Sequence, residues 1–166
     1  MSAALGLVTI HRQKASVERC PGRPRLVSWA TAALRVAPHT SPCALTVRFV
    51  DADEAQTLNV QYRHKNYATN VLSFPYDAPS LPDEHLSPDE PTYLGDLVIC
   101  LPVVLSEAAA QKKPVPAHTA HLVIHGVLHL LGFDHETTAD AEAMESREII
   151  ALQQLGFANP YLELNE

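Results

Sequence analysis

A chain of 166 residues, 46% of them hydrophobic and 19% charged, has the composition of an ordinary globular protein. That length suits one domain, 1–166, with a core large enough to be stable without disulfides. No apolar run reaches the roughly 20 residues that a membrane-spanning helix needs, so we expect no membrane association and no signal peptide. The three cysteines are odd in number and widely spaced, which favours reduced thiols and a cytoplasmic location.

The net charge of −7 is unevenly distributed along the chain. Residues 1–65 hold nine Lys and Arg against four acidic residues, whereas residues 66–166 hold three against fifteen. This asymmetry is compatible with a basic face that binds phosphates. Scattered, solvated surface charge explains it equally well.

In the first half of the chain, apolar spacing and alternation predict three strands and a helix. We expect Asp51 to be the N-cap of a second helix, over 53–63, with Asp53 and Glu54 favourable in its first turn. Pro75 indicates that the third strand lies at an edge or ends there. The expected strands cover 5–10, 44–50 and 70–76, and the first helix covers 26–36.

The second half begins with a stretch rich in Asp, Pro and Ser, over 77–92, which we expect to be an exposed loop. A strongly apolar strand follows over 94–101, and helices are expected over 102–111, 117–131 and 138–155. These elements predict a mixed α/β (α+β) fold, with a small sheet of about four strands packed against helices.

The segment HGVLHLLGFDH contains three histidines at a spacing typical of a metal site. His125 and His129 are four residues apart in a helical pattern, so their side chains lie on the same face. Gly132 can end the helix and reverse the chain, which lets His135 approach the same ion. Three protein ligands and a fourth position for water form a catalytic zinc site, although nickel, copper or iron would also be acceptable.

Other histidines leave alternatives open. His121 precedes His125 by four residues and is interpreted as a ligand, a partner of a ligand or a surface residue. The remaining ones are expected at the surface: His11, His39, His64, His85 and His118.

The same spacing occurs in metzincin proteases, which carry a glutamate directly after the first histidine as general base. Gly126 occupies that position here. The missing carboxylate counts against peptide hydrolysis.

With this segment in view, the chain resembles the YbeY family of rRNA-maturation endoribonucleases. Two further blocks carry the resemblance, LNVQYRHKNYATNVLSFPY at 58–76 and YLGDLVICLPVV at 93–104. It extends over roughly residues 44–161. The resemblance implies a single α/β domain that binds one Zn²⁺ through His125, His129 and His135. It also implies cleavage of single-stranded RNA, maturation of the 3′ end of the 16S rRNA precursor, and ribosome quality control. The partners it implies are the small ribosomal subunit and an rRNA-binding GTPase.

The resemblance further implies that Arg63 is the functional arginine beside the metal, so we assign it to catalysis together with the three histidines. Its planar, permanently charged group suits a phosphate oxygen, and Lys65 could add a second charge for substrate binding. Three assignments stay open. Asp134 is a candidate base or only a turn residue, and Asp96 either orients an imidazole or makes a structural hydrogen bond. Substrate contact or ordinary strand and turn chemistry would each explain Thr69, Asn70 and Ser73.

Two other functions remain as hypotheses. One is a metzincin-like metalloprotease or amidase. The other is a ribosome-assembly binding factor in which the metal is structural.

Overall fold

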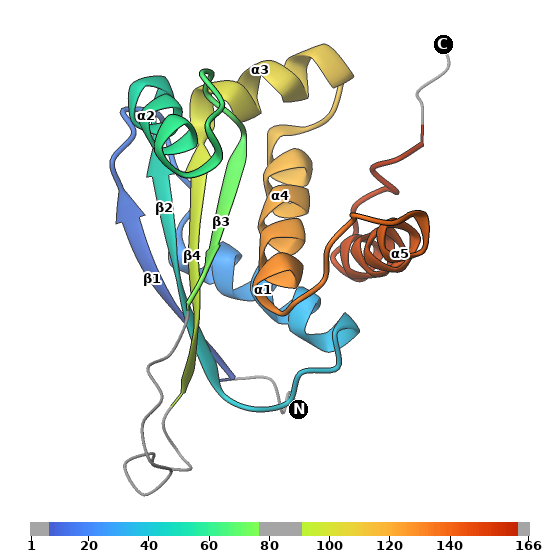
Figure 1. Ribbon diagram of the computed structural model, residues 1–166. Helices are drawn as coiled ribbons and strands as arrows, with labels where there is room; N and C mark the ends of the chain where they lie inside the picture. The colour runs from blue at the N-terminus through green and yellow to red at the C-terminus, as the bar shows by residue number, and fades with distance from the viewer. Residues whose placement is uncertain (1–6, 77–90, 163–166) are drawn as a thin grey trace, which may run out of the picture.

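The computed structural model describes residues 7–76 and 91–162, in which four strands form one sheet in the order β1-β2-β4-β3 (Figure 1). β1, β2 and β4 run parallel, and β3 is antiparallel to β4 at one edge. The predicted mixed α/β fold with about four strands is confirmed. The strands are β1 (Val8–Lys14), β2 (Cys43–Val50), β3 (Val71–Pro75) and β4 (Thr92–Cys100).

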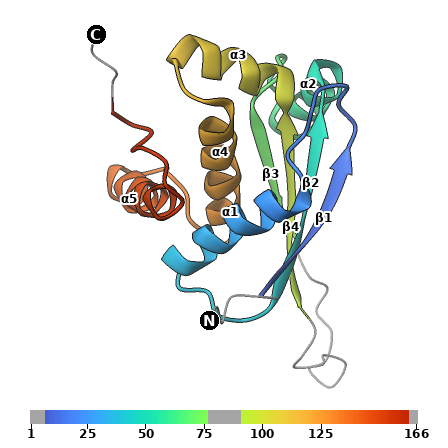
Figure 2. The ribbon, with the colours of Figure 1, turned by 180° about the vertical axis from the view of Figure 1, so that it is seen from behind.

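Five helices accompany the sheet in these residues: α1 (Arg23–Val36), α2 (Ala52–Arg63), α3 (Leu101–Gln111), α4 (Val115–Leu130) and α5 (Thr138–Gln154). Helices α1, α4 and α5 pack against one another on one side of the sheet, as both views show (Figures 1 and 2). None of the helices described has the length and apolarity needed to cross a membrane.

The two faces of β4 belong to different cores, because successive side chains of a strand point in opposite directions. Leu97 and Ile99 join the large cluster that α1 and α4 complete. Val98 and Cys100 face the other way and pack in a smaller cluster with Ala55 of α2. Helix α2 therefore covers the opposite face of the sheet from α4.

Several element boundaries differ from those expected. β1 was expected over 5–10 but runs to Lys14, because it stays in parallel register with β2 as far as Phe49. Residues 5 and 6 lie outside the described residues, as does most of the expected loop, 77–90. Pro75 is the last residue of the edge strand β3, as predicted.

Asp51 is the N-cap residue of α2, but its carboxylate makes no capping hydrogen bond. It accepts hydrogen bonds from the Ser16 hydroxyl and, at 3.1 Å, from the backbone N–H of Val17. Asp51 is thus the N-cap residue that the sequence predicts, without the side-chain hydrogen bond typical of this position. The carboxylate instead holds the segment after β1 against the junction of β2 and α2.

Candidate metal centre

Helix α4 and the turn after it bring three imidazoles together. Gly132 has a φ of 103°, a conformation that favours glycine, and its N–H donates to the carbonyl of His129 at 3.0 Å. The reversal returns the chain toward the helix face that carries His125 and His129. One potential ligand atom from each of these residues and from His135 lies within 4.8 Å of the other two. The three histidines predicted as ligands thus form a group that could hold one metal ion.

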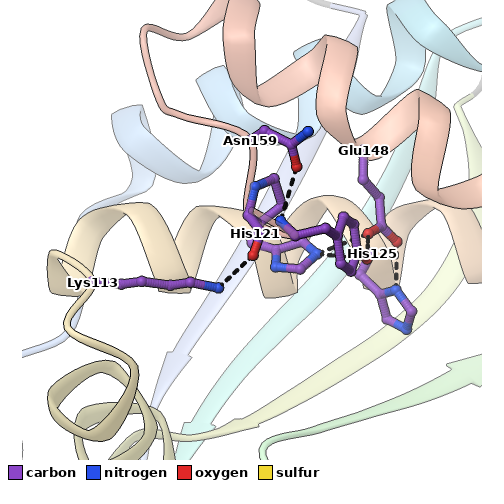
Figure 3. A network of polar contacts seen from close by, with 7 residues as sticks. Lys113, His121, His125, Glu148 and Asn159 are labelled. Atoms are coloured by element: carbon purple, nitrogen blue, oxygen red, sulfur yellow. Dashed lines mark hydrogen bonds and ion pairs between the residues drawn. The ribbon is translucent and has the colours of Figure 1, made fainter. Parts of the chain in front are cut away.

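A buried glutamate from α5 orients this group. Glu148 is fully buried, and its Oε2 accepts a hydrogen bond from Nδ1 of His125 at 2.6 Å (Figure 3). Its other oxygen accepts one from Nε2 of His121 at 2.7 Å and another from the hydroxyl of Tyr161. Because Nδ1 of His125 donates to this carboxylate, Nε2 stays available as a metal ligand. Histidines that bind a metal through one ring nitrogen usually donate a hydrogen bond from the other. His121 is thus a partner of Glu148.

The pKa shifts suit a cation at this position. Burial on its own would raise the pKa of Glu148, but hydrogen bonds from His121 and His125 outweigh it and lower the pKa to about 2. Burial lowers the pKa of His129, and the neighbouring His125 and His135 lower it further. An ionised Glu148 and a neutral His129 are protonation states that suit metal binding.

The three histidines line a cavity of about 630 Å³. Arg63, exposed in the last turn of α2, lines the same cavity, so the structure brings the predicted arginine beside the predicted ligands. Lys65 is exposed and does not belong to the lining, and its role in substrate binding stays a prediction. Three polar residues before and within β3 also face the cavity: Thr69, Asn70 and Ser73.

The two aspartates left open have local partners. Asp134 accepts the backbone N–H of Glu136 at 3.2 Å, which is a turn interaction. Asp96 accepts a hydrogen bond from the Tyr93 hydroxyl. Neither contact involves an imidazole.

Of the histidines expected at the surface, His11 and His64 are exposed and His39 is half-buried. The expectation for His118 was wrong. It is buried, and its Nε2 lies 2.9 Å from Glu107 Oε1, because α3 and α4 pack against each other. His85 lies outside the described residues.

Gly126 lies where α4 meets the sheet. A Cβ atom at this position would be 2.6 Å from Cδ2 of Leu97, a fully buried side chain of β4. The position that holds the general base of a metzincin therefore has no room here for a carboxylate side chain. This steric restriction agrees with the sequence argument against a protease.

Glu148 and Tyr161 were not predicted from the sequence. A signal for Glu148 existed, because it lies at helical spacing with Met144, Ala151 and Leu152, all buried on the same face of α5. A single acid on an apolar face is expected to have a buried partner. Tyr161 follows the last helix and offers no comparable local signal.

Three imidazoles beside an open cavity form the donor set of a catalytic rather than a closed structural metal site. Fold and site together define a small α/β protein with a candidate metal centre of the kind found in hydrolases. The family model described as Endoribonuclease YbeY matches residues 10–156. This chain belongs to the YbeY family, and the predicted resemblance is confirmed.

Individual relatives agree with this assignment. A protein named Endoribonuclease YbeY from Alkalilimnicola ehrlichii is 56% identical over 133 residues, 80% of this chain and 77% of the relative. One of the same name from Pseudomonas savastanoi pv. phaseolicola is 50% identical over 157 residues, 95% and 90% of the two chains. The solution structure of TM1509 from Thermotoga maritima has a TM-score of 0.54 and 21% identity, covering 93% of this chain and 99% of that one. This last likeness shows the fold alone.

Proposed function

We propose that the chain is a zinc-dependent endoribonuclease that hydrolyses single-stranded RNA. The observation that carries the proposal is that Arg63 and the three histidines line one cavity. Membership of the YbeY family and the name Endoribonuclease of the relatives support RNA as the substrate.

One Zn²⁺ per chain is the proposed cofactor, held by His125, His129 and His135. Three neutral imidazoles with a further position left open suit zinc, and the hydrogen bond from His125 to Glu148 supports a ligand role for the other ring nitrogen. When bound, zinc would lower the pKa of a coordinated water toward about 7 and polarise a phosphoryl oxygen.

The chain's own residues supply the remaining functions. The guanidinium of Arg63 can bind a non-bridging phosphate oxygen with two N–H donors and stabilise the charge that develops there. Glu148 keeps the proton of His125 on Nδ1 and fixes the direction of the ring. Lys65, two residues beyond Arg63, is proposed to attract the RNA backbone.

The cellular role follows from the family resemblance. We propose action on the 3′ end of the 16S rRNA precursor and in ribosome quality control, with the small ribosomal subunit and an rRNA-binding GTPase as partners. A cytoplasmic location agrees with the three cysteines, which are all free.

The Arg63→Ala variant tests the proposed function. It should keep its zinc, because Arg63 is not a ligand, but lose about 100- to 1,000-fold in the rate of single-stranded RNA cleavage. His129→Ala should lose both zinc and activity. Arg35→Ala, which removes an exposed arginine at the end of α1, controls for charge and for copurifying nuclease. Normal cleavage by Arg63→Ala would contradict the assigned role.

A further inference from the structure

A second cavity, of about 620 Å³, adjoins the metal cavity. The two cavities share four lining residues, Asn70, His121, Leu122 and Tyr161, so these residues form a wall common to both. Both volumes lie within the range of about 300–1,000 Å³ that is usual for ligand sites. A polymer long enough to extend from the histidines past Tyr161 would reach the second cavity.

Tyr161 presents a fixed aromatic ring between the two cavities. Its hydroxyl donates to Glu148, and its backbone N–H donates to Oδ1 of Asn159 at 2.8 Å. One edge-on contact with His121, at 5.3 Å between ring centroids, leaves the residue 44% exposed. A ring that is held in place and open to solvent can stack a nucleobase, whatever the base.

Positive charge lines the far side of the second cavity. Lys112 and Lys113 lie between α3 and α4, and both belong to the lining. The ammonium of Lys113 donates to the carbonyl of Pro160 at 2.8 Å, which leaves two of its three N–H donors free (Figure 3). Lys112 is exposed.

Glu107 is the acidic residue in this lining, and its carboxylate already has hydrogen-bond partners within the protein. Its carboxylate accepts hydrogen bonds from Nδ2 of Asn70 at 3.1 Å and from Nε2 of His118 at 2.9 Å. Two donors on one carboxylate reduce its repulsion of an approaching phosphate. With two lysines against one acid, the lining of the second cavity carries a net positive charge.

We propose that the second cavity is a subsite for single-stranded RNA beside the scissile phosphate, in which Tyr161 stacks a base and Lys112 and Lys113 bind the backbone phosphate beyond it. This subsite rests on the proposed function. It gives a physical reason for single-strand preference, because a base inside a duplex is already stacked and cannot cover the tyrosine. It also requires that RNA long enough to enter the subsite binds more tightly than a dinucleotide.

The test measures binding of a fluorescent single-stranded RNA with phosphorothioate linkages, which resist hydrolysis, to the zinc-loaded protein at several salt concentrations. Tyr161→Ala should weaken binding about 5- to 150-fold, since stacking contributes about 1–3 kcal/mol per base. Tyr161→Phe keeps the ring but loses the hydroxyl that donates to Glu148, so it should lose less affinity than Tyr161→Ala. The double variant Lys112→Ala/Lys113→Ala should bind more weakly and reduce the salt slope by about 0.7 for each phosphate that the protein no longer neutralises.

Lys14→Ala is the matched control, because Lys14 lies on β1 at the opposite edge of the sheet from β3. The lysine substitutions should not change the affinity for a dinucleotide. The subsite is overturned if the double lysine variant binds long RNA with the affinity and salt slope of Lys14→Ala. It is also overturned if Tyr161→Phe loses as much affinity as Tyr161→Ala. If the wild type binds RNA but does not cleave an unmodified strand, the proposed function fails, and the binding comparison still decides the subsite.

Discussion

A single carboxylate, Glu148, fixes two imidazoles of the site at the residue scale. Its two oxygens accept hydrogen bonds from His121 and His125, and the Tyr161 hydroxyl adds a third. The cost of burying this charge is offset only because all three donors are present. The orientation of His121 and His125 on α4 therefore depends on α5 and on the segment after it.

Glu148→Gln tests this dependence. His121 and His125 donate to different oxygens of Glu148, and the amide replaces one of these oxygens with an NH2 donor, so we expect the affinity for zinc to fall about 10- to 100-fold. Competition with a chromogenic chelator measures the change. Glu142→Gln, an exposed position on the same helix, is the control and should leave the affinity unchanged. Equal zinc affinity in the two variants would show that Glu148 does not orient the ligand.

At the scale of elements, apolar periodicity predicted most of the fold because each helix or strand buries one face. The helix over 117–131 and the reversal at Gly132 were predicted from local spacing alone, and the structure places α4 over Val115–Leu130. The three histidines could be predicted for the same reason, since helix geometry and one turn bring them together. Arg63 was assigned only through the family resemblance, because no local pattern says that the end of α2 faces α4.

Features that depend on contacts between distant elements were missed. His118 was expected at the surface, and only the packing of α3 against α4 buries it beside Glu107. Asp51 is the predicted N-cap residue of α2, but the partner of its carboxylate, 35 residues earlier in the chain, was not predicted. No local pattern specifies such partners.

The Asp51 contact makes a prediction about stability and pH. The Ser16 hydroxyl and the Val17 N–H lower the pKa of Asp51 below its ordinary value of 3.8. A carboxyl group whose pKa is lower in the folded state stabilises the fold above its unfolded pKa, and this contribution disappears as the pH falls through the folded value. Asp51→Asn should therefore be less stable than the wild type near neutral pH, and the difference should shrink as the pH falls below 3.8. Urea unfolding in the presence of a chelator measures the difference in the free energy of unfolding between the two proteins. A difference that stays constant with pH would contradict the contribution of the Asp51 hydrogen bonds.

At the scale of the whole molecule, several basic side chains of the positively charged segment 1–65 already have partners within the protein. The side chains of Arg12 and Arg23 donate to backbone carbonyls, and Arg48 pairs with Glu54 at 2.7 Å. Of the basic residues in segment 1–65, the lining of the metal cavity contains Arg63.

This distribution predicts a shallow salt dependence. If Arg63, Lys112 and Lys113 are the main phosphate contacts, the slope of log K against log salt should be about −2, since each contact on a single strand contributes about −0.7. Binding of single-stranded RNA measured over a range of salt concentrations gives this slope. A value steeper than about −5 would mean that other arginines and lysines of residues 1–65 also contact the RNA.

RNA cleavage by this protein should depend on the metal that the three histidines hold. The decisive experiment removes the metal with a chelator, returns zinc stepwise and follows single-stranded RNA cleavage, with His129→Ala treated in parallel. We expect activity to rise in proportion to zinc, to reach its plateau at one zinc per chain, and to stay absent in the variant. A stripped protein that cleaves as fast as the loaded one, or a variant that recovers with zinc like the wild type, would contradict this role of the histidines.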